Sequence, residues 1–321
     1  MKAIVHTQYG PPEVAKLKEV DKPIPSKNQV LVKIFATTVN RTDCGFRSAE
    51  YFISRFFSGL FRPNQQILGC EFAGIVEEIG SEVKEFKIGD SVFGFDDVKF
   101  GSHAEYKVIA EDKAVITIPG GLSFEIAAAI GEGAHYAWCD IRAAKIQKGQ
   151  NILINGATGA IGSAAVQLVK YLGATVTAVC DTKNVALVKS LGADVIIDYK
   201  KADFTQLQVT FDVVFDAVGK SSFGKCKPLL KKGGIYISTE LGYMSQNPFL
   251  ALITPLFGGK KVMFPIPVTT KADIEFLRML ATEGHFKPVL DRTYQLEEIV
   301  EAYRFVETGQ KTGNVVIIVN Q

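Results

Sequence analysis

The sequence is poor in the features that define several large classes of protein. Its net charge is only +2, from 36 basic and 34 acidic side chains, so no chain-wide positive field points to nucleic acid as a partner. The longest apolar run, PFLALITPLFGG, is interrupted by prolines and is shorter than the roughly 20 residues that a membrane span needs. The segment MKAIVHTQYG lacks the apolar region of a signal peptide. We therefore expect a cytoplasmic protein without a membrane span.

Cysteine is also scarce, and its spacing excludes two kinds of site. No Cys-x-x-Cys pair occurs, so the sequence encodes neither a disulfide framework nor a structural zinc loop. Four of the five cysteines are interpreted as ordinary buried side chains, and only Cys70 has a second interpretation, as a metal ligand. The five are Cys44, Cys70, Cys139, Cys180 and Cys226.

What the chain does have is enough apolar sequence for two domains. Its 321 residues are 47% hydrophobic, and single domains usually contain roughly 100–200 residues. Residues 1–122 contain short β-rich runs between Gly, Pro and Asp turns, which predicts a barrel-like β domain. An irregular aromatic insertion, residues 47–66, interrupts this pattern, and such insertions are often functional.

Residues 123–265 follow a different pattern, in which strands such as NILIN and TVTAVC alternate with helical stretches. This alternation predicts an α/β domain with a doubly wound parallel sheet. Residues 266–321 contain two helical stretches and a closing strand, NVVIIV, which has no βαβ partner. We expect this strand to pair with the first domain, so that residues 1–122 and 266–321 form one discontinuous domain.

The strongest local motif is NILINGATGAIG, a strand followed at once by a glycine-rich turn and a helix. Glycines let the backbone approach a pyrophosphate, and the helix N-terminus supplies free N–H donors. The first glycine of the usual fingerprint is replaced, because the pattern reads Ala157-x-Gly159-x-x-Gly162. The predicted nicotinamide-cofactor contacts in this turn are Gly156, Ala157, Thr158, Gly159, Ala160, Ile161 and Gly162.

The choice between the two nicotinamide cofactors depends on the segment VCDTKN. An acidic group at the end of the second strand favours the ribose of NAD, and a basic group favours the phosphate of NADP. The chain offers both, as Asp181 and Lys183. An alternative interpretation is that Asp181 or Thr182 caps the next helix.

Several segments together resemble the zinc-independent quinone oxidoreductase branch of the medium-chain dehydrogenase/reductase superfamily. They are the glycine turn, LGCEFAGIVEEIGSEVKEFKIGDSVFGF, GSHAEY, SLGADVIIDY, FDAVG and KTGNVVI. The resemblance implies a GroES-like β-barrel catalytic domain, a Rossmann domain (residues 123–265) and a homodimer. It further implies NADPH as cofactor, with NADH possible, and cofactor contacts from Val218, Lys311, Gly313 and Asn314.

The same resemblance bears on zinc. Zinc-binding members carry a Cys, a His and a second Cys where this chain has Asn40, Cys70 and Glu132, and the lobe of four cysteines for structural zinc is absent. Because Asn is a poor zinc ligand, we predict no metal site. A site built from Cys70, Glu71 and Glu132 remains an alternative.

The implied substrate is a quinone or an α,β-unsaturated carbonyl. The resemblance gives Asn40 a hydrogen bond to the substrate carbonyl or the nicotinamide ribose, and makes Tyr51 a candidate proton donor. His103 and His135 are interpreted as structural or surface side chains. Two other functions stay open: a zinc-dependent alcohol dehydrogenase, and an NADPH-binding protein without turnover. The aromatic residues expected to line the insertion with Tyr51 are Phe46, Phe52, Phe56, Phe57 and Phe61.

Overall fold

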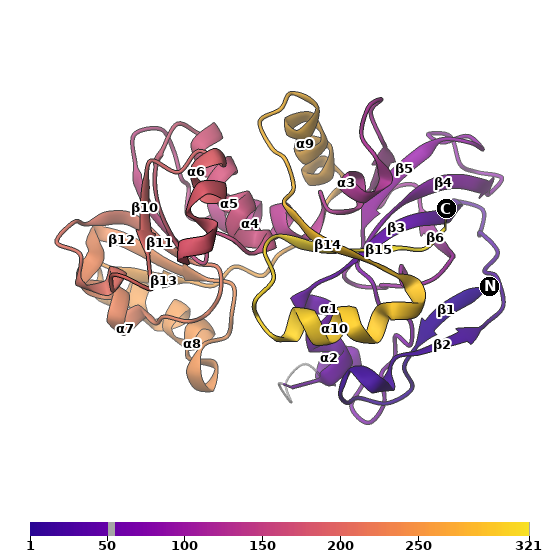
Figure 1. The fold of residues 1–321 in the computed structure, drawn as a ribbon, viewed down its shortest axis with the longest axis horizontal. Coiled ribbons are helices and arrows are strands. Elements are labelled where there is room, and N and C mark those ends of the chain that lie inside the picture. Colours follow the sequence, from indigo (N-terminus) through magenta and orange to yellow (C-terminus); the bar gives the residue numbers. More distant parts are fainter. Residues whose placement is uncertain (51–54, 321) are drawn as a thin grey trace. The chain divides into compact units, whose positions relative to one another are not determined.

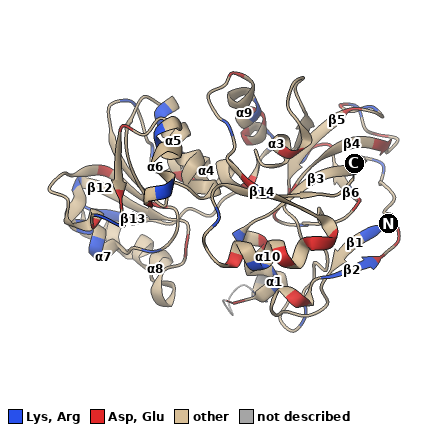
Figure 2. Cartoon of the chain, in the orientation of Figure 1, with Lys and Arg blue, Asp and Glu red and all other residues tan. Residues whose placement is uncertain are grey.

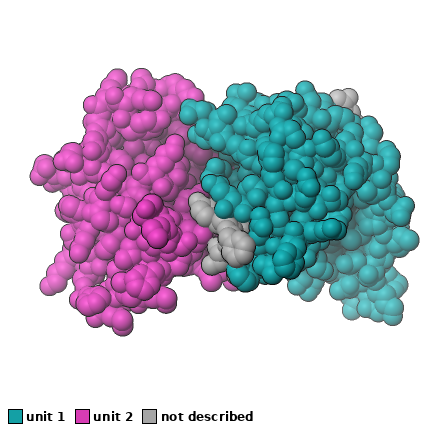
Figure 3. All heavy atoms as spheres, turned by 90° about the horizontal axis from the view of Figure 1, so that it is seen from below, with its two compact units in different colours: residues 1–132, 269–282, 288–321 teal, residues 133–268, 283–287 magenta. Residues whose placement is uncertain are grey.

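The computed structural model describes residues 1–50 and 55–320 (Figure 1). Figure 2 shows acidic and basic residues interspersed along the chain, consistent with its small net charge. Two compact units are present, coloured separately in Figure 3. Unit 1 comprises Met1–Glu132, Thr269–Thr282 and Pro288–Gln321, and unit 2 comprises Gly133–Val268 and Glu283–Lys287. No helix in the described part of the chain is long and apolar enough to cross a membrane.

Unit 1 is built on a seven-stranded sheet with the order β14-β15-β3-β4-β5-β7, in which β6 also pairs with β3. The closing strand β15 runs antiparallel to β3, with Val315 opposite Val39, so the predicted return of the chain to the first domain is confirmed. A separate two-stranded sheet joins β1 (Lys2–Val5) and β2 (Lys16–Glu19). The strands of the large sheet are β3 (Gln29–Val39), β4 (Glu71–Ile79), β5 (Ser91–Phe95), β6 (Tyr106–Ala110), β7 (Val115–Thr117), β14 (Leu290–Gln295) and β15 (Asn314–Ile318).

The helices of unit 1 pack by their apolar faces. In α10 the buried residues Ile299, Ala302, Tyr303 and Val306 recur at helical spacing, and they form one core with Val315 and Ile317 of β15. The helices are α1 (Arg41–Ser48), α2 (Arg55–Ser58), α3 (Phe124–Ala128), α9 (Lys271–Thr282) and α10 (Ile299–Glu307), with the 3-10 helices η1 (Pro12–Val14) and η8 (Leu296–Glu298).

Residues 123–132 belong to unit 1, although the sequence predicts a domain boundary before residue 123. The reason is aromatic packing: the ring of Phe124 in α3 stacks on that of Phe35 in β3, with ring centroids 4.8 Å apart. Ser123 begins α3 as predicted, and its side chain accepts a hydrogen bond from the backbone N–H of Ile126.

Unit 2 contains a six-stranded parallel sheet with the order β10-β9-β8-β11-β12-β13. The strands β8 and β9 are buried from their second residue onward, because helices cover a parallel sheet on both faces. This architecture confirms the predicted doubly wound sheet. The strands are β8 (Asn151–Asn155), β9 (Thr175–Cys180), β10 (Val195–Asp198), β11 (Phe211–Asp216), β12 (Leu230–Ser238) and β13 (Lys261–Met263).

The helices of unit 2 occupy the segments between these strands. The first, α4 (Glu132–Ala143), begins at the last residue of unit 1, and α5 follows the glycine turn directly. The others are α5 (Ala160–Tyr171), α6 (Val185–Ser190), α7 (Phe223–Cys226) and α8 (Gln246–Ile253), with the 3-10 helices η3 (Thr182–Asn184), η4 (Phe204–Gln206), η5 (Lys227–Leu229), η6 (Tyr243–Ser245) and η7 (Thr254–Phe257).

Candidate active site

A buried polar cluster forms in unit 1 where several elements begin or end. Strand β3 ends at Val39, β4 begins at Glu71, α4 begins at Glu132, and β15 begins at Asn314. The β3 and β4 register places Thr37 opposite Phe72, and the β3 and β15 register places Val39 opposite Val315. Side chains that are distant in sequence therefore meet at one place. We call Thr38, Asn40, Thr42, Asp43, Cys70, Glu71, Glu132 and Lys311 the polar cluster.

Asn40 uses both ends of its side-chain amide inside this cluster. Its Nδ2 donates to Glu71 Oε2 at 2.9 Å and to Thr38 Oγ1 at 3.1 Å. Its Oδ1 accepts a hydrogen bond from Lys311 Nζ at 3.2 Å. The residue is 2% exposed, so the amide is held in a defined orientation.

Glu71 links three elements of the unit. Its Oε1 accepts the backbone N–H of Glu132 at 2.7 Å, and its Oε2 accepts the hydroxyl of Thr38 and the amide of Asn40. Burial raises the pKa of Glu71 to about 7, although the hydrogen bonds from Thr38 and from the Glu132 backbone oppose the rise. The carboxyl group therefore changes charge near neutral pH.

Asp43 and Cys70 form a second part of the cluster. Asp43 accepts backbone N–H groups from Asn40 and from Gly69, each at 3.0 Å. The Cys70 thiol donates to Asp43 Oδ1 at 3.7 Å. Burial, reinforced by the negative charge of Asp43, raises the pKa of Cys70 well above its usual range. The thiol is therefore protonated at neutral pH.

Glu132 is the third buried carboxyl group. Its Oε1 accepts the hydroxyl of Thr42 at 2.6 Å, and its Oε2 has no hydrogen-bond partner among the described residues. Burial, with the charges of Asp43 and Glu71, raises the pKa of Glu132 well above that of an ordinary glutamate. A group in this state can hold a proton at neutral pH.

The resemblance to zinc-containing dehydrogenases raises the question of whether the cluster fits a zinc ion. Asp43, Cys70 and Glu132 offer one ligand atom each, and these atoms lie within 4.8 Å of one another. However, Asp43 already accepts two backbone amides, and the Lys311 ammonium lies beside Asn40. A dication would lie near an ammonium group, so the residues fit a resident zinc ion poorly.

His103 is also buried in unit 1 and has a structural environment. Its Nε2 lies 2.8 Å from the carbonyl oxygen of Thr38, and its Nδ1 lies 3.4 Å from the hydroxyl of Tyr303. His135, in contrast, lies in α4, where its ring contacts Cys139 Sγ at 3.6 Å.

Tyr51 and Phe52 lie outside the described residues. The side chain of Phe57, another aromatic residue of the insertion, also lies outside the described part of the structure. Phe56 and Phe61 are exposed, and Phe46 packs against Phe100, with ring centroids 4.7 Å apart.

The glycine turn lies in unit 2, between β8 and α5. Gly156 has φ +82°, and a Cβ at this position would lie 2.2 Å from Val218 Cγ1, so the structure brings Val218 to the turn. A Cβ at Gly162 would lie 2.0 Å from the carbonyl oxygen of Gly156. Gly159 is the N-cap of α5, and a Cβ there would meet no atom within 4 Å. The turn therefore has a packed side and an open side, next to the free first-turn amides of α5.

Asp181 and Lys183 lie at the end of β9. Asp181 occupies the N-cap position of η3, but its carboxylate accepts from the side chain of Asn184 at 2.6 Å and not from a backbone N–H. Thr182 donates to Asp198 at 2.6 Å. The Lys183 ammonium lies 3.9 Å from Asp181, which leaves an exposed cation beside a half-buried carboxylate.

The remaining predicted cofactor residues lie in unit 1, next to the polar cluster. Gly313 has φ +71°, and a Cβ there would lie 2.1 Å from the carbonyl oxygen of Val289. The backbone N–H of Asn314 donates to the same oxygen at 2.7 Å. The side chain of Lys311 points to Asn40, a contact that the sequence does not predict.

Thr38, Thr42 and Asp43 are not among the site residues that the sequence predicts. All three lie in TTVNRTD, the stretch that contains Asn40, where hydroxyl and carboxylate groups flank the end of a buried strand. That concentration of polar side chains at a strand end was the available signal.

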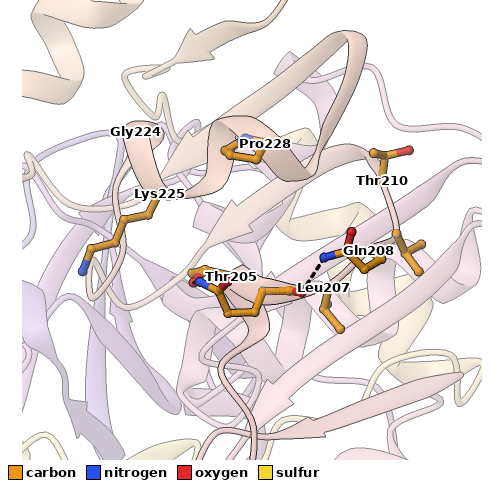
Figure 4. Close-up of a pocket in the computed structure, with 9 residues that line it drawn as sticks. Thr205, Leu207, Gln208, Thr210, Gly224, Lys225 and Pro228 are labelled. Atoms are coloured by element: carbon orange, nitrogen blue, oxygen red, sulfur yellow. Dashed lines mark hydrogen bonds between the residues drawn. The ribbon is translucent and has the colours of Figure 1, made fainter.

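A large surface depression lies elsewhere, in unit 2 (Figure 4). It measures about 480 Å³ and is lined by the polar and apolar residues of the segment 205–210, with Gly224, Lys225 and Pro228. It contains none of the predicted site residues. Its lining is a hydrogen-bonded loop, in which Gln208 donates to the carbonyl oxygen of Gln206 at 3.2 Å.

Comparison with known proteins identifies the family. Residues 26–120 match the alcohol dehydrogenase GroES-like domain, and residues 191–317 match the zinc-binding dehydrogenase family. The chain is 35% identical to 2-methylene-furan-3-one reductase of Solanum lycopersicum, over 99% of this chain and 79% of that protein. It is 31% identical to a chloroplastic NADPH-dependent alkenal/one oxidoreductase of Arabidopsis thaliana, with the same coverage.

Solved structures agree with these relatives. The quinone oxidoreductase from Coxiella burnetii matches with a TM-score of 0.89 and 29% identity, over 100% of this chain and 99% of that one. An NAD-dependent alcohol dehydrogenase matches with a TM-score of 0.84 and 25% identity, over the full length of both chains. The chain belongs to the medium-chain dehydrogenase/reductase superfamily, in the branch of the quinone oxidoreductases and enone reductases. It is an oxidoreductase with a GroES-like domain and a Rossmann-type sheet.

Proposed function

We propose that the protein uses NADPH to reduce quinones or α,β-unsaturated carbonyls by hydride transfer, without a metal. The observation that carries this proposal is the Lys311 ammonium beside Asn40, a positive charge that belongs to the protein itself. The names of relatives support the substrate class, since they include an alkenal/one oxidoreductase and quinone oxidoreductases.

The chemistry of these acceptors suits such a site. Oxidation of a simple alcohol needs help in stabilising an alkoxide, which a metal supplies as a Lewis acid. A quinone or enone is already electrophilic, so hydride delivery needs alignment and a hydrogen bond to the developing oxyanion. The hydride carries both electrons to the acceptor, and one proton must follow.

The proposed roles are divided between the units. The turn from Gly156 to Gly162 binds the pyrophosphate of the cofactor through backbone amides. Asn40 hydrogen-bonds the acceptor carbonyl, for which it exchanges its 3.1 Å contact with Thr38. Tyr51 or water supplies the proton.

A cofactor-by-acceptor activity matrix on metal-free protein tests the proposal. NADPH and NADH are each combined with a quinone and with an enone. The oxidised cofactors, NADP⁺ and NAD⁺, are each combined with a primary alcohol. We expect turnover with the quinone or the enone, a modest preference for NADPH, and no effect of a chelator. Alcohol oxidation without quinone or enone reduction would contradict the proposal. NADPH binding with no turnover across the panel would instead support a cofactor-binding protein.

A zinc-dependent alcohol dehydrogenase is the second candidate, because one oxygen of Glu132, within a group of three possible ligands, has no partner in the part of the chain that the structure describes. Elemental analysis separates the two candidates. The proposal requires far less than one zinc per chain, whereas stoichiometric zinc together with loss of activity on chelation supports the second candidate.

A homodimer is also part of the proposal. Among the described strands, β13 has a hydrogen-bonded neighbour on one side only, and exposed apolar side chains lie in α8 and η7 near it in sequence. Exposed apolar patches beside a free strand edge favour association. Light scattering should give twice the 35.0 kDa chain mass, and Leu252→Glu with Leu256→Glu should give the monomer. The exposed side chains are Phe249, Leu252, Leu256 and Phe257.

We further propose a cytoplasmic location, which fractionation of cells that express the protein would test. Recovery in an organelle fraction, as the name of the chloroplastic relative suggests for that protein, would contradict it.

A further inference from the structure

Lys311 lies in the segment before β15, and its ammonium group points into the polar cluster of unit 1. Its Nζ donates to the carbonyl oxygen of Gly313 at 2.6 Å and to Asn40 Oδ1 at 3.2 Å. The segment is fixed next to it, because the backbone N–H of Thr312 donates to Asp291 at 2.6 Å. The ammonium is therefore held in place by its own loop.

The groups that face Lys311 are mainly acidic. Burial lowers the pKa of Lys311, while the nearby Glu132, Cys44, Glu71 and Asp291 oppose this effect. In turn, the charge of Lys311 lowers the pKa of both Glu71 and Glu132. Lys311 thus interacts electrostatically with two of the three buried carboxyl groups in the cluster.

The ammonium also decides how the Asn40 amide is turned. A lysine side chain has only donors, so the end of the amide that faces it must be the oxygen. The nitrogen then faces the Glu71 carboxyl at 2.9 Å. Without Lys311, only the contacts of the amide nitrogen with Glu71 and Thr38 would hold the amide, and the oxygen would lose its hydrogen bond to Lys311.

We propose that Lys311 is a positioning residue that fixes the Asn40 amide and supplies, within the polar cluster, the positive charge that zinc supplies in metal-containing members. The first half of this inference, that Lys311 positions Asn40 for catalysis, is the positioning part, and it rests on the proposed function. The second half, that Lys311 supplies the positive charge of the cluster, is the charge part, and it does not rest on the proposed function because it concerns only the residues of the cluster.

Cobalt binding tests the charge part without any activity measurement. Co²⁺ bound to a thiolate has visible and near-ultraviolet bands that report on Cys70. Wild type, Lys311→Met and Lys311→Arg are titrated with Co²⁺, with Lys18→Met, which removes an exposed lysine, as the control. Circular dichroism and thermal unfolding confirm that each variant is folded.

We expect Lys311→Met to bind Co²⁺ at least about tenfold more tightly than wild type, since the uncompensated acidic groups then favour a cation. Lys311→Arg and Lys18→Met should behave as wild type. A second change, Cys70→Ser, should remove the bands gained by Lys311→Met. Equal affinity in wild type and Lys311→Met would overturn the charge part, as would stoichiometric zinc in wild type.

Steady-state kinetics and NADPH binding test the positioning part. Lys311→Met should lower kcat about 10- to 100-fold while the Kd for NADPH changes less than about threefold, and Lys311→Arg should recover part of kcat. An unchanged kcat in Lys311→Met would overturn the positioning part. A Kd for NADPH raised more than about tenfold with kcat retained would also overturn it, and would show that Lys311 contacts the cofactor instead. Absence of turnover in wild type would reject the proposed function, whereas the cobalt result would still decide the charge part.

Discussion

The glycine turn of unit 2 and the polar cluster of unit 1 are built in opposite ways. The turn is made of seven consecutive residues, and its shape depends on backbone conformation and on the lack of side chains at Gly156 and Gly162. The cluster is made of side chains from positions 38 to 311, which meet through strand pairing and helix packing. A local site such as the glycine turn is determined by adjacent residues of the sequence, whereas a site such as the polar cluster depends on the fold.

The comparison also separates two kinds of chemistry. Backbone N–H groups in the turn bind without changing charge, so their action depends little on pH. The cluster contains titratable groups whose pKa values are shifted by burial, including Glu71 at about 7. Substitutions in the turn should therefore act through shape, and substitutions in the cluster should act through charge and hydrogen bonding.

The largest expected effect comes from Gly162→Ala. The new Cβ would lie 2.0 Å from the carbonyl oxygen of Gly156, so the backbone of the turn must move. We expect NADPH affinity to fall on the order of 100-fold or more, as measured by fluorescence titration. The free energy of unfolding should fall by about 1–3 kcal/mol.

Gly159→Ala is the matched change in the same turn, because its Cβ would meet no protein atom within 4 Å. Because Gly159 is the N-cap of α5 and Ala is a poorer cap than Gly, its stability should fall slightly, by less than about 1 kcal/mol, while NADPH binding weakens if the cofactor approaches this open side. A loss of stability in Gly159→Ala as large as in Gly162→Ala, or full NADPH affinity in Gly162→Ala, would show that the division into packed and open sides is wrong.

Asn40→Ala should have the next largest effect. Loss of one hydrogen bond to the acceptor, worth about 1.4–2.7 kcal/mol in the transition state, should lower kcat/KM about 10- to 100-fold. Affinity for NADPH should stay nearly unchanged. Steady-state kinetics with a quinone and an enone measure the effect, with Asn28→Ala, an exposed residue of the same unit, as the control. An unaffected Asn40→Ala enzyme would remove the residue from the mechanism.

Cofactor preference should respond more weakly, because Asp181 and Lys183 oppose each other 3.9 Å apart. We expect wild type to favour NADPH by less than about tenfold, or 1.4 kcal/mol. Lys183→Ala should shift the ratio of kcat/KM values toward NADH, and Asp181→Asn should shift it toward NADPH. A wild-type preference for NADH beyond about tenfold would mean that Asp181, and not Lys183, determines the cofactor preference.

The last effect concerns the pH dependence of stability and does not involve turnover. Burial raises the pKa of Glu71 from 4.5 to about 7, so the folded state holds a proton that the unfolded state releases between these values. The stabilising contribution of this proton is complete below pH 4.5 and is lost as pH rises through 7.

Glu71→Gln should therefore flatten the fall of stability between pH 4.5 and 7, by up to about 3 kcal/mol in urea unfolding. Glu78→Gln, an exposed side chain on the same strand, should leave the profile unchanged. A steeper profile in Glu71→Gln would mean that the sign of the shift is wrong.

Sequence patterns predicted the main elements because each depends on local periodicity. The alternation of strands and helices predicted the parallel sheet of unit 2, and α5 (Ala160–Tyr171) follows the glycine turn as expected. The pairing of NVVIIV with the first domain was predicted because the strand had no partner nearby. The assignment of residues 123–132 to unit 1 was not, since it depends on the stacking of Phe124 on Phe35.

The sequence by itself determined the glycine turn, the family and the absence of a usual zinc ligand set, since each is a matter of residue type at adjacent or aligned positions. Only the tertiary structure decided that Lys311 faces Asn40, that Glu71 links Thr38 to the start of α4, and that Glu132 keeps one oxygen unpartnered among the described residues. The physical reason is that burial and through-space charge fix the state of these groups. Neither can be read from spacing along the chain, because the interacting residues are up to 271 positions apart.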